Sequence, residues 1–405
     1  MEHIVLVVPA ESYRADAFLQ AAQRSSQQLT VVTDAKLPLG DQNIAVESMH
    51  PKPDELARIE ELLFTRAPSI VLGVDEVSTR LAARLSDALG LTSERSAMVE
   101  RAIDKATLRE ALALAEVNQP PFVVTTIAAL KSQTRKEFET LVDSVGDDFI
   151  IKPTHETASR GVIRAHHNDL HQALDQLSRV QDPSAPVLLE RYIEGPEFAI
   201  EGIVHGDQLE ILMIFAKPDI GTGPYFWEST YIGPAHLTER ERRELTSALE
   251  RGIRALGLKD TPIHAELRLA NERATILEIA PRSIGGRCSA ALRFGDGQRL
   301  EDIILARALG DTRIARPLHE TVGIYMIPTP REGILAGVTG LDAARSVGGI
   351  VGIEITVANG THVFPPPFTD RYLGFIFAQD PGQSRVRQAL ARAASLLEIR
   401  IDPVH

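Results

Sequence analysis

The sequence has 405 residues, 44% of them apolar and 24% charged; this length exceeds a single typical core and predicts two or three domains. The net charge of −12 argues against a nucleic-acid or anionic-membrane partner, and a single cysteine, Cys288, excludes an internal disulfide and a cysteine-based zinc site. No apolar stretch approaches the roughly 20 residues that span a bilayer, and the N-terminus lacks a signal-peptide pattern. We therefore expect a cytoplasmic protein.

Residues 1–96 alternate strand patterns with helix patterns. Continuous apolar runs indicate strands at residues 4–8, 29–32 and 70–74. Residues 77–89 have the spacing of an amphipathic helix, and Gly90 follows as its stop. This alternation predicts a parallel sheet with helical crossovers. The loop at residues 9–12 has no glycine, so we expect no dinucleotide site there.

The sequence patterns of the remaining chain predict two further domains, at residues 97–309 and 310–405. The first is α+β, with a helix at 97–115, a strand at 148–153 and a helix at 238–256 that has Thr238 as its N-cap. The second returns to strands, expected at 322–327, 349–355 and 372–378, and closes with a helix at 384–397. The sequence contains no internal repeat.

Two segments of alternating apolar and polar residues, 263–269 and 275–279, predict a β-hairpin. If residues 271–273 form its loop, Glu266 falls directly opposite Glu278. Like charges in that position destabilise a sheet, so a cation must offset their repulsion. Mg²⁺ prefers one or two carboxylates plus nucleotide phosphates and suits this pair, whereas the alternative is a solvated charged face. The opposite face is expected to pack on the core through Leu267, Leu277 and Ile279.

Two lysines are candidate phosphate ligands. Lys152 ends an apolar strand and is followed by a loop of small residues at 154–162, so it can place a cation and backbone N–H groups around phosphate oxygens. A lysine at a strand end can equally be a solvent-exposed residue. Lys105 lies in a helical pattern, where a lysine usually belongs to a solvated face.

A polar connector follows the apolar strand at residues 187–189, and the chain re-enters an alternating strand at Glu197. Such a connector can bind an adenine edge through main-chain groups, while an acidic side chain accepts ribose hydroxyls. In the alternative interpretation, Glu190 and Glu197 are ordinary residues at the rim of the fold.

The order of these pieces resembles the ATP-grasp superfamily over essentially the full length. The resemblance rests on Lys105, Lys152 with its loop, residues 189–193, Glu197, and the two glutamates followed by Pro281-Arg282. Three stretches look most like the L-amino-acid ligase branch, which joins amino acids into dipeptides: residues 217–226, 278–286 and 371–378. The resemblance implies an ATP-grasp fold with a Rossmann-like domain at 1–96, an ATP-grasp domain at 97–309 whose smaller lid spans about 115–190, and a β-rich subdomain at 310–405.

The resemblance also implies roles for individual residues. ATP would be bound by Lys105, Lys152, Ser159, Arg160, Gly161, Glu190, Arg191, Tyr192, Ile193, Glu197 and Arg268, with the lysines on phosphates, the main chain of 190–193 on adenine and Glu197 on ribose. Glu266 and Glu278 would ligate Mg²⁺, which Mn²⁺ could replace. Arg282 would contact the transferred phosphate. Substrate contacts are implied for Lys217, Tyr225, Phe226, Gly285 and Gly286.

Some residues allow two interpretations or depart from the family pattern. His264 and Arg268 flank Glu266, and each either contacts phosphate or substrate or holds Glu266 through an ion pair. Ala280 stands where many relatives have an asparagine, which removes one potential metal ligand. The loop after Lys152 has only one glycine where relatives usually have several.

The implied reaction is ATP-dependent joining of a small carboxylate to an amine, such as two amino acids, through an acyl phosphate with release of ADP and phosphate. This chemistry needs charge neutralisation and positioning more than a protein nucleophile, and the chain offers no convincing nucleophile set. One alternative is an ATP-grasp carboxylase that uses bicarbonate, and another is a nucleotide-binding module without catalysis. The substrates are small molecules, and a homodimer is compatible with the resemblance.

Overall fold

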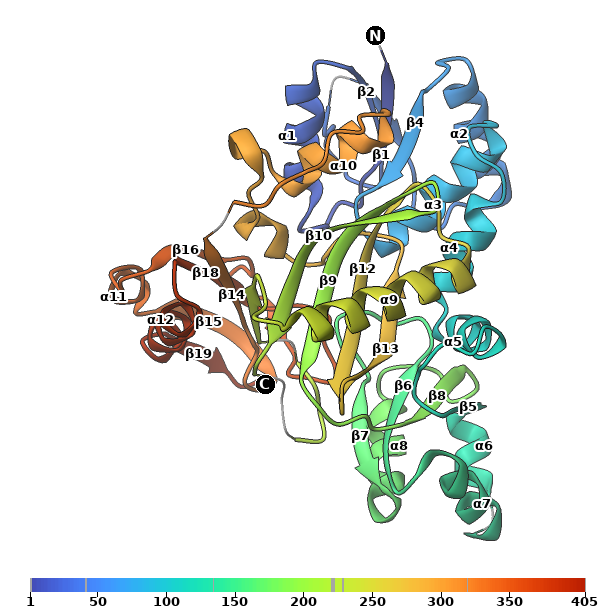
Figure 1. Cartoon of the computed structure of the whole chain (residues 1–405), viewed down its shortest axis with the longest axis vertical. Coiled ribbons are helices and arrows are strands. Elements are labelled where there is room, and N and C mark those ends of the chain that lie inside the picture. Colours follow the sequence, from blue (N-terminus) through green and yellow to red (C-terminus); the bar gives the residue numbers. More distant parts are fainter. Residues whose placement is uncertain are drawn as a thin grey trace.

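The computed structural model describes residues 2–40, 42–133, 135–219, 223–227, 229–318 and 320–404. The fold is mixed α/β, as predicted, with a parallel sheet near the N-terminus and antiparallel sheets after it. Figure 1 shows the N-terminal sheet and a small antiparallel sheet at opposite ends of the long axis, with the largest sheet between them. No helix in these ranges is both long and apolar enough to cross a membrane.

The N-terminal unit is the predicted parallel sheet, with strand order β3-β2-β1-β4. Its strands are β1 (His3–Val7), β2 (Gln28–Thr33), β3 (Asn43–Ala45) and β4 (Ile70–Gly73). Its helices are α1 (Ala15–Ser25), α2 (Pro53–Phe64) and α3 (Glu76–Ala88). Helix α3 begins just after β4, and its first residue, Glu76, contacts Arg282 after β13.

The prediction of a single helix at residues 97–115 is wrong. The structure has two helices, α4 (Arg95–Ile103) and α5 (Lys105–Leu114), separated by Asp104 in an extended conformation. The Asp104 carboxylate accepts hydrogen bonds from the backbone N–H groups of the second and third residues of α5, which favours a new helix start over continuation. Lys105 is therefore the first residue of a helix rather than part of a solvated helical face.

The small sheet, called the lid below (residues 122–191), has strand order β5-β8-β6-β7 and is antiparallel. Its strands are β5 (Phe122–Thr126), β6 (Asp148–Pro153), β7 (Ile163–His166) and β8 (Pro186–Arg191). Three helices accompany it: α6 (Ile127–Ser132), α7 (Arg135–Val145) and α8 (Leu170–Leu177). The loop between β6 and β7, residues 154–162, is called the lid loop.

An eight-stranded antiparallel sheet, the central sheet, has the order β13-β12-β9-β10-β11-β14-β18-β16. Its strands are β9 (Glu197–His205), β10 (Gln208–Lys217), β11 (Thr230–Gly233), β12 (Thr261–Ala270), β13 (Arg273–Ala280), β14 (Thr321–Ile327), β16 (Ile350–Ile355) and β18 (Gly374–Asp380). Helices α9 (Glu239–Leu256), α10 (Leu300–Ala308) and α12 (Gln383–Ser395) pack around it. As predicted, Thr238 caps α9. The sheet continues across residue 310, where the sequence suggested a domain boundary.

A last small sheet combines β17 (His362–Val363), β15 (Gly333–Thr339) and β19 (Glu398–Asp402), beside the short helix α11 (Leu341–Arg345). The sequence patterns did not predict β15 or β19. The apolar signal is weak in both: β15 contains two glycines and has no regular alternation, and β19 has one buried position, Ile401.

The hairpin β12–β13 brings Glu266 opposite Glu278, as predicted, although its turn is shorter than expected. Asn271 and Glu272 alone form the turn, both with positive φ, as a two-residue type I′ turn requires. A bulge next to Glu266 restores the predicted register. The bulge leaves Leu277 unpaired and turns its side chain into a cavity, so the prediction that Leu277 packs on the opposite face is wrong.

Gly195, in the connector between β8 and β9, needs to be glycine for two reasons. Its φ is +108°, and a Cβ there would lie 2.6 Å from the carbonyl oxygen of Leu269. Gly206 in the β9–β10 turn also has a positive φ, but nothing lies within 4 Å of its Cβ position. Gly195→Ala should therefore lower the free energy of unfolding by about 2 kcal/mol or more, and Gly206→Ala by about 1 kcal/mol. Urea unfolding measures both, and equal losses would contradict the close approach.

Candidate active site

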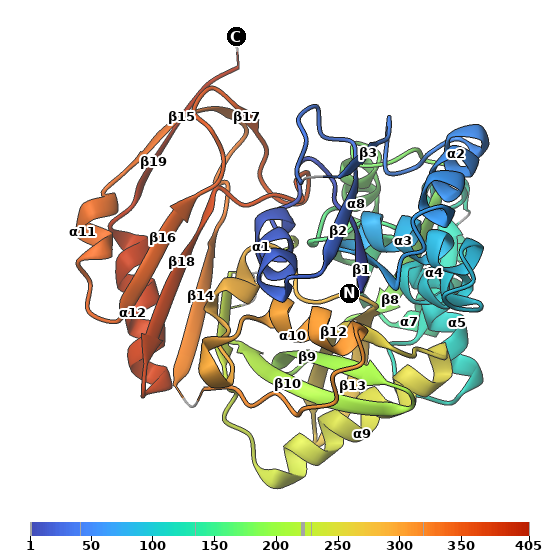
Figure 2. The same ribbon diagram turned by 90° about the horizontal axis from the view of Figure 1, so that it is seen from above.

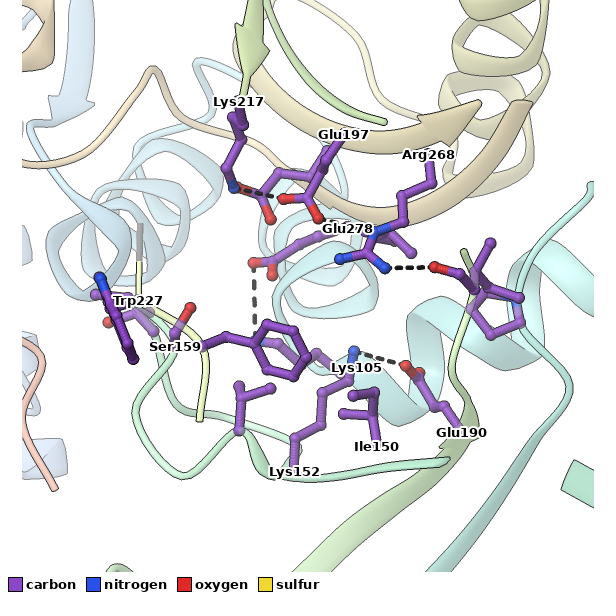
Figure 3. Close-up of a pocket in the computed structure, with 18 of the residues that line it drawn as sticks. Lys105, Ile150, Lys152, Ser159, Glu190, Glu197, Lys217, Trp227, Arg268 and Glu278 are labelled. Atoms are coloured by element: carbon purple, nitrogen blue, oxygen red, sulfur yellow. Dashed lines mark hydrogen bonds and ion pairs between the residues drawn. The ribbon is translucent and has the colours of Figure 1, made fainter. Parts of the chain in front are cut away.

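A single cavity between the lid and the central sheet collects most of the residues that the sequence suggested (Figure 3). Basic and acidic side chains dominate its walls, together with a few apolar and aromatic groups. From the predicted set it is lined by Lys105, Lys152, Ser159, Glu190, Arg191, Tyr192, Ile193, Glu197, Lys217, Phe226, Glu266, Arg268, Glu278 and Arg282. The lid loop, the β8–β9 connector, the hairpin and the start of α5 therefore meet at one place.

Two lysines contact the opposed carboxylates. Lys217, at the end of β10, places its Nζ 2.7 Å from Glu266 Oε1 and 2.6 Å from Glu197 Oε1. Lys105 Nζ lies 3.7 Å from Glu278 Oε1. Burial and the charge of Glu266 would raise the pKa of Glu278, but the combined charges of Lys105, Arg282 and Lys152 lower it. Each of the two facing carboxylates therefore has a lysine beside it.

His264 lies between two carboxylates, those of Glu201 and Glu266. Its Nδ1 contacts Glu201 Oε1, and its Nε2 lies 3.7 Å from Glu266 Oε1. Burial would lower the pKa of His264, but Glu201 and Glu266 raise it to about 9, so the imidazole is protonated at neutral pH. The other oxygen of Glu201 accepts a hydrogen bond from the backbone N–H of Ile284 at 2.8 Å, which ties this group to the segment after β13.

Arg268 forms its ion pair with Glu197 and not with Glu266, the partner considered from the sequence. Its Nε lies 3.0 Å from Glu197 Oε2, and its Nη1 donates to the carbonyl oxygen of Ile193. Its guanidinium carbon lies 4.7 Å from the ring centroid of Tyr192. Arg268 therefore fixes the β8–β9 connector against the central sheet and orients Glu197.

On the lid side, Lys152 and Glu190 form a buried ion pair (Figure 3), with Lys152 Nζ 2.8 Å from Glu190 Oε2. Arg109 of α5 approaches the other oxygen, with Nε 2.5 Å from Oε1. Burial by itself would raise the pKa of Glu190, but Arg109 and Lys152 outweigh it and lower this pKa to about 2. Burial lowers the pKa of Lys152 against the pull of Glu190.

The N-terminal unit contributes Glu76, which the sequence analysis missed. Its Oε2 lies 3.4 Å from Nε of Arg282, and burial raises its pKa despite that cation. A usable signal was present in the sequence, since Asp75-Glu76 follows a parallel strand, and ligand sites gather at such strand ends. Arg282 also donates from Nη1 to the Ser283 carbonyl oxygen at 3.2 Å. Trp227 forms an aromatic wall of the cavity, and Ile150 and Leu277, which the sequence did not assign to the site, form apolar walls.

Five predicted residues do not line this cavity. Arg160 points away and pairs with Glu156 at 2.9 Å, and the N–H of Gly161 donates to the Pro367 carbonyl oxygen at 2.8 Å. Tyr225 packs on the lid core and lines a separate pocket with Arg164. Gly285 and Gly286 follow the buried Ser283–Ile284 segment, and a Cβ on Gly286 would lie 3.0 Å from the Phe375 ring.

Within the described ranges, no group of three or more His, Cys, Asp or Glu side chains could hold a metal ion by itself. The facing pair of Glu266 and Glu278 offers two carboxylates, so a cation there needs further ligands from another source. Phosphate oxygens could supply them, and Lys105, Lys152 and Arg282 line the same cavity.

Two parts of the chain match models of known protein families. Residues 145–291 match the ATP-grasp domain model, and residues 325–402 match the model of the L-amino acid ligase C-terminal domain 2. The chain contains an ATP-grasp domain. The matched ATP-grasp region includes both facing glutamates, Lys152, Lys217 and Arg282. Lys105 lies outside it, on α5.

Several relatives share about a quarter of the aligned residues with this ATP-grasp chain. Alanine–anticapsin ligase of Bacillus subtilis (strain 168) is 25% identical over 58% of this chain and 53% of its own length, and dapdiamide A synthase of Enterobacter agglomerans is 26% identical over 56% and 54%. An uncharacterised protein of Sinorhizobium fredii is 25% identical over 75% of this chain and 62% of its own. The chain thus spans between half and two thirds of these relatives.

Solved structures share the fold over nearly the whole chain. An L-amino acid ligase from Bacillus licheniformis has a TM-score of 0.83 at 21% identity, with 99% of both chains covered. An ATP complex of a carboxyaminoimidazole ribonucleotide synthase has a TM-score of 0.74 at 15% identity, with 96% and 98% covered. These likenesses establish the fold of residues on both sides of the matched ATP-grasp domain.

The buried Glu190 leads to a stability prediction. Because its pKa falls from 4.5 to about 2 in the folded state, its ionisation stabilises the fold above pH 4.5 by about 3 kcal/mol, and this contribution is lost as the pH falls toward 2. Glu190→Gln should lower the free energy of unfolding by about that amount at neutral pH, and the difference from the parent should shrink in acid.

The control is Asp175→Asn, which breaks the exposed ion pair between Asp175 and Lys131 at 2.7 Å. Water and salt screen that pair, so the variant should unfold almost as the parent does. Urea titrations from pH 7 to pH 3 measure both. A pH-independent loss in Glu190→Gln would contradict the ionised state of the buried carboxylate.

Proposed function

We propose that this protein is an ATP-dependent ligase that joins a small carboxylate to an amine, with amino acids as the substrate class. The observation that carries the proposal is the facing pair of Glu266 and Glu278 in one cavity with Lys105, Lys152 and Arg282. The match of residues 325–402 to an L-amino acid ligase C-terminal domain supports amino acids over other carboxylates. The names of the curated relatives agree with this class.

ATP would lie between the lid and the central sheet. Lys105 and Lys152 would bind its phosphates, since both ammonium groups line the cavity from different elements. The main chain of residues 190–193 would bind adenine, with Ile150 and Leu277 offering apolar walls. Glu197, held by Arg268 and Lys217, would accept the ribose hydroxyls.

Mg²⁺ fits the donor set at the hairpin. Two facing carboxylates and the phosphate oxygens of a nucleotide are the ligands that Mg²⁺ prefers. Glu266 and Glu278 would hold it, with Mn²⁺ as a possible substitute, and the bound ion would neutralise phosphate charge. Lys217 and Lys105, which now neutralise these carboxylates, would become available to substrate or phosphate oxygens.

The chain's residues suit a two-step reaction. A carboxylate oxygen of the first substrate attacks the γ-phosphorus, and the bond from phosphorus to the ADP oxygen breaks. The amine nitrogen then attacks the acyl carbon, the carbon–oxygen bond to phosphate breaks, and the amine gives up a proton. Arg282, supported by Glu76, would stabilise the transferred phosphoryl group, because a guanidinium matches its oxygens bidentately.

The lid loop would protect the acyl phosphate from water. It is held over the cavity by the Lys105 Nζ hydrogen bond to the Glu156 carbonyl oxygen at 2.7 Å. A second tie joins the Gly161 N–H to the Pro367 carbonyl oxygen at 2.8 Å. These two bonds hold the loop over the cavity although it contains only one glycine.

A bicarbonate-using carboxylase is the second candidate, because solved carboxyaminoimidazole ribonucleotide synthetases share the fold. ADP release separates the two when it is measured across amino-acid mixtures and, in parallel, with bicarbonate. We expect ADP only when both a carboxylate and an amine are present, and mass spectrometry should find the amide. ADP that appears only with bicarbonate would decide for the carboxylase, and no ADP under either condition would favour a non-catalytic nucleotide-binding module.

Arg282→Lys tests the proposed chemistry. The variant should lower kcat and kcat/KM together by about tenfold or more while the KM for ATP changes little, because the lost contact acts mainly in the transition state. Hydroxylamine added with the carboxylate substrate should trap less hydroxamate in the variant. Arg287→Lys is the control, since Arg287 pairs with Glu354 at 2.8 Å and does not line the cavity. A rise in the ATP KM alone would assign Arg282 to ground-state binding.

A further inference from the structure

A second cavity, called the side cavity, lies where three parts of the chain meet. The loop after β1, with Glu11 and Tyr13, forms one wall, and Arg160 of the lid loop forms another. The remaining walls come from residues 356–373, beside β17 (Figure 2). Its volume of about 630 Å³ lies within the range of small-molecule sites. None of the roles described above uses this space.

The side cavity offers charges of both signs. Arg371 pairs with Glu11, and Arg160 pairs with Glu156, while the side chains of Arg371 and Arg160 remain 51% and 33% exposed. Such partly exposed pairs contribute little stability and exchange readily for a ligand's charges. Asp370 also lines the cavity, and no described residue forms a hydrogen bond or ion pair with its carboxylate. A free α-amino acid carries both a carboxylate and an ammonium group and matches this arrangement.

A small hollow lies between the side cavity and the ATP cavity and shares walls with both. Its walls include Ala158, Phe226 and Trp227 of the ATP cavity and, from the side cavity, Thr329 and residues 369–371. The hollow has a volume of only about 10 Å³, about the space of one water molecule. The side cavity therefore lies directly behind one wall of the proposed reaction centre.

The lid completes the side cavity. Arg160 reaches it from the lid loop, whose neighbour Gly161 donates to the Pro367 carbonyl oxygen. Arg179 of the lid lies over the Phe368 ring, with its guanidinium carbon 4.0 Å from the ring centroid. The lid loop therefore lines both the ATP cavity and the side cavity.

We propose that the side cavity binds the amino acid that supplies the amine, with Arg371 holding its carboxylate and Asp370 its ammonium group. This assignment rests on the proposed ligase function. The first substrate and ATP occupy the cavity at Glu266 and Glu278, and the second enters from the side cavity past Trp227.

The kinetic test uses Arg371→Ala and Asp370→Asn. Each should raise the KM for the amine substrate by about tenfold or more, while the KM values for ATP and the first carboxylate stay within about twofold. Hydroxylamine lacks a carboxylate, so its KM should not change in Arg371→Ala. The matched control is Arg345→Ala, because Arg345 is also 51% exposed and pairs with Asp342 at 3.3 Å, away from both cavities. An unchanged amine KM, or an equal rise for hydroxylamine, would overturn the proposal.

A binding experiment separates this proposal from the ligase function. Equilibrium dialysis with a radiolabelled mixture of amino acids, Mg²⁺ and a non-hydrolysable ATP analogue needs no turnover. The parent should retain label, and Arg371→Ala and Asp370→Asn should retain clearly less. Equal retention in all three proteins would overturn the site even if the parent is an active ligase. Specific retention without any amide product would keep the site and refute the ligase function.

Discussion

The structure depends on keeping two carboxylates, Glu266 and Glu278, side by side on adjacent strands. Their repulsion is offset by Lys217 and Lys105, and the protonated His264 adds positive charge behind Glu266. These cations come from three different elements, β10, α5 and β12. In the proposed complex, a bound metal–phosphate group would replace the lysines as the source of positive charge beside the two carboxylates.

Further ion pairs around the cavity connect the lid, helix α5 and the N-terminal unit to one another or to the segment after β13. Glu190 links Lys152 of the lid to Arg109 of α5, and Glu76 links the N-terminal unit to Arg282. Each of these contacts is buried or nearly so, where an unpaired charge would be costly. The orientation of the lid and the N-terminal unit is therefore coupled to the charges of the cavity. This coupling explains how residues remote in sequence can keep a defined geometry at one site.

The sequence predicted the features that depend on local pattern, and it missed those that depend on tertiary contacts. Alternation and turn residues were sufficient to place Glu266 opposite Glu278, although the correct pairing arises from a shorter turn plus a bulge. No periodicity reveals a bulge, so Leu277 was assigned to the wrong face. The break at Asp104 was missed because the apolar spacing continues through it, and only the cap interactions end the first helix. The side cavity requires the relative placement of separate units, which no local pattern encodes, whereas the position of Glu76 after a parallel strand was a signal that the sequence analysis did not use.

The central claim is that Glu266 and Glu278 together form a metal–nucleotide site. Isothermal titration calorimetry of a non-hydrolysable ATP analogue, with and without Mg²⁺, tests it most directly in the parent and in Glu278→Gln. In the parent, Mg²⁺ should tighten analogue binding by about tenfold or more, and in Glu278→Gln this gain should largely disappear. An equal gain from Mg²⁺ in both proteins, or none in the parent, would contradict the account.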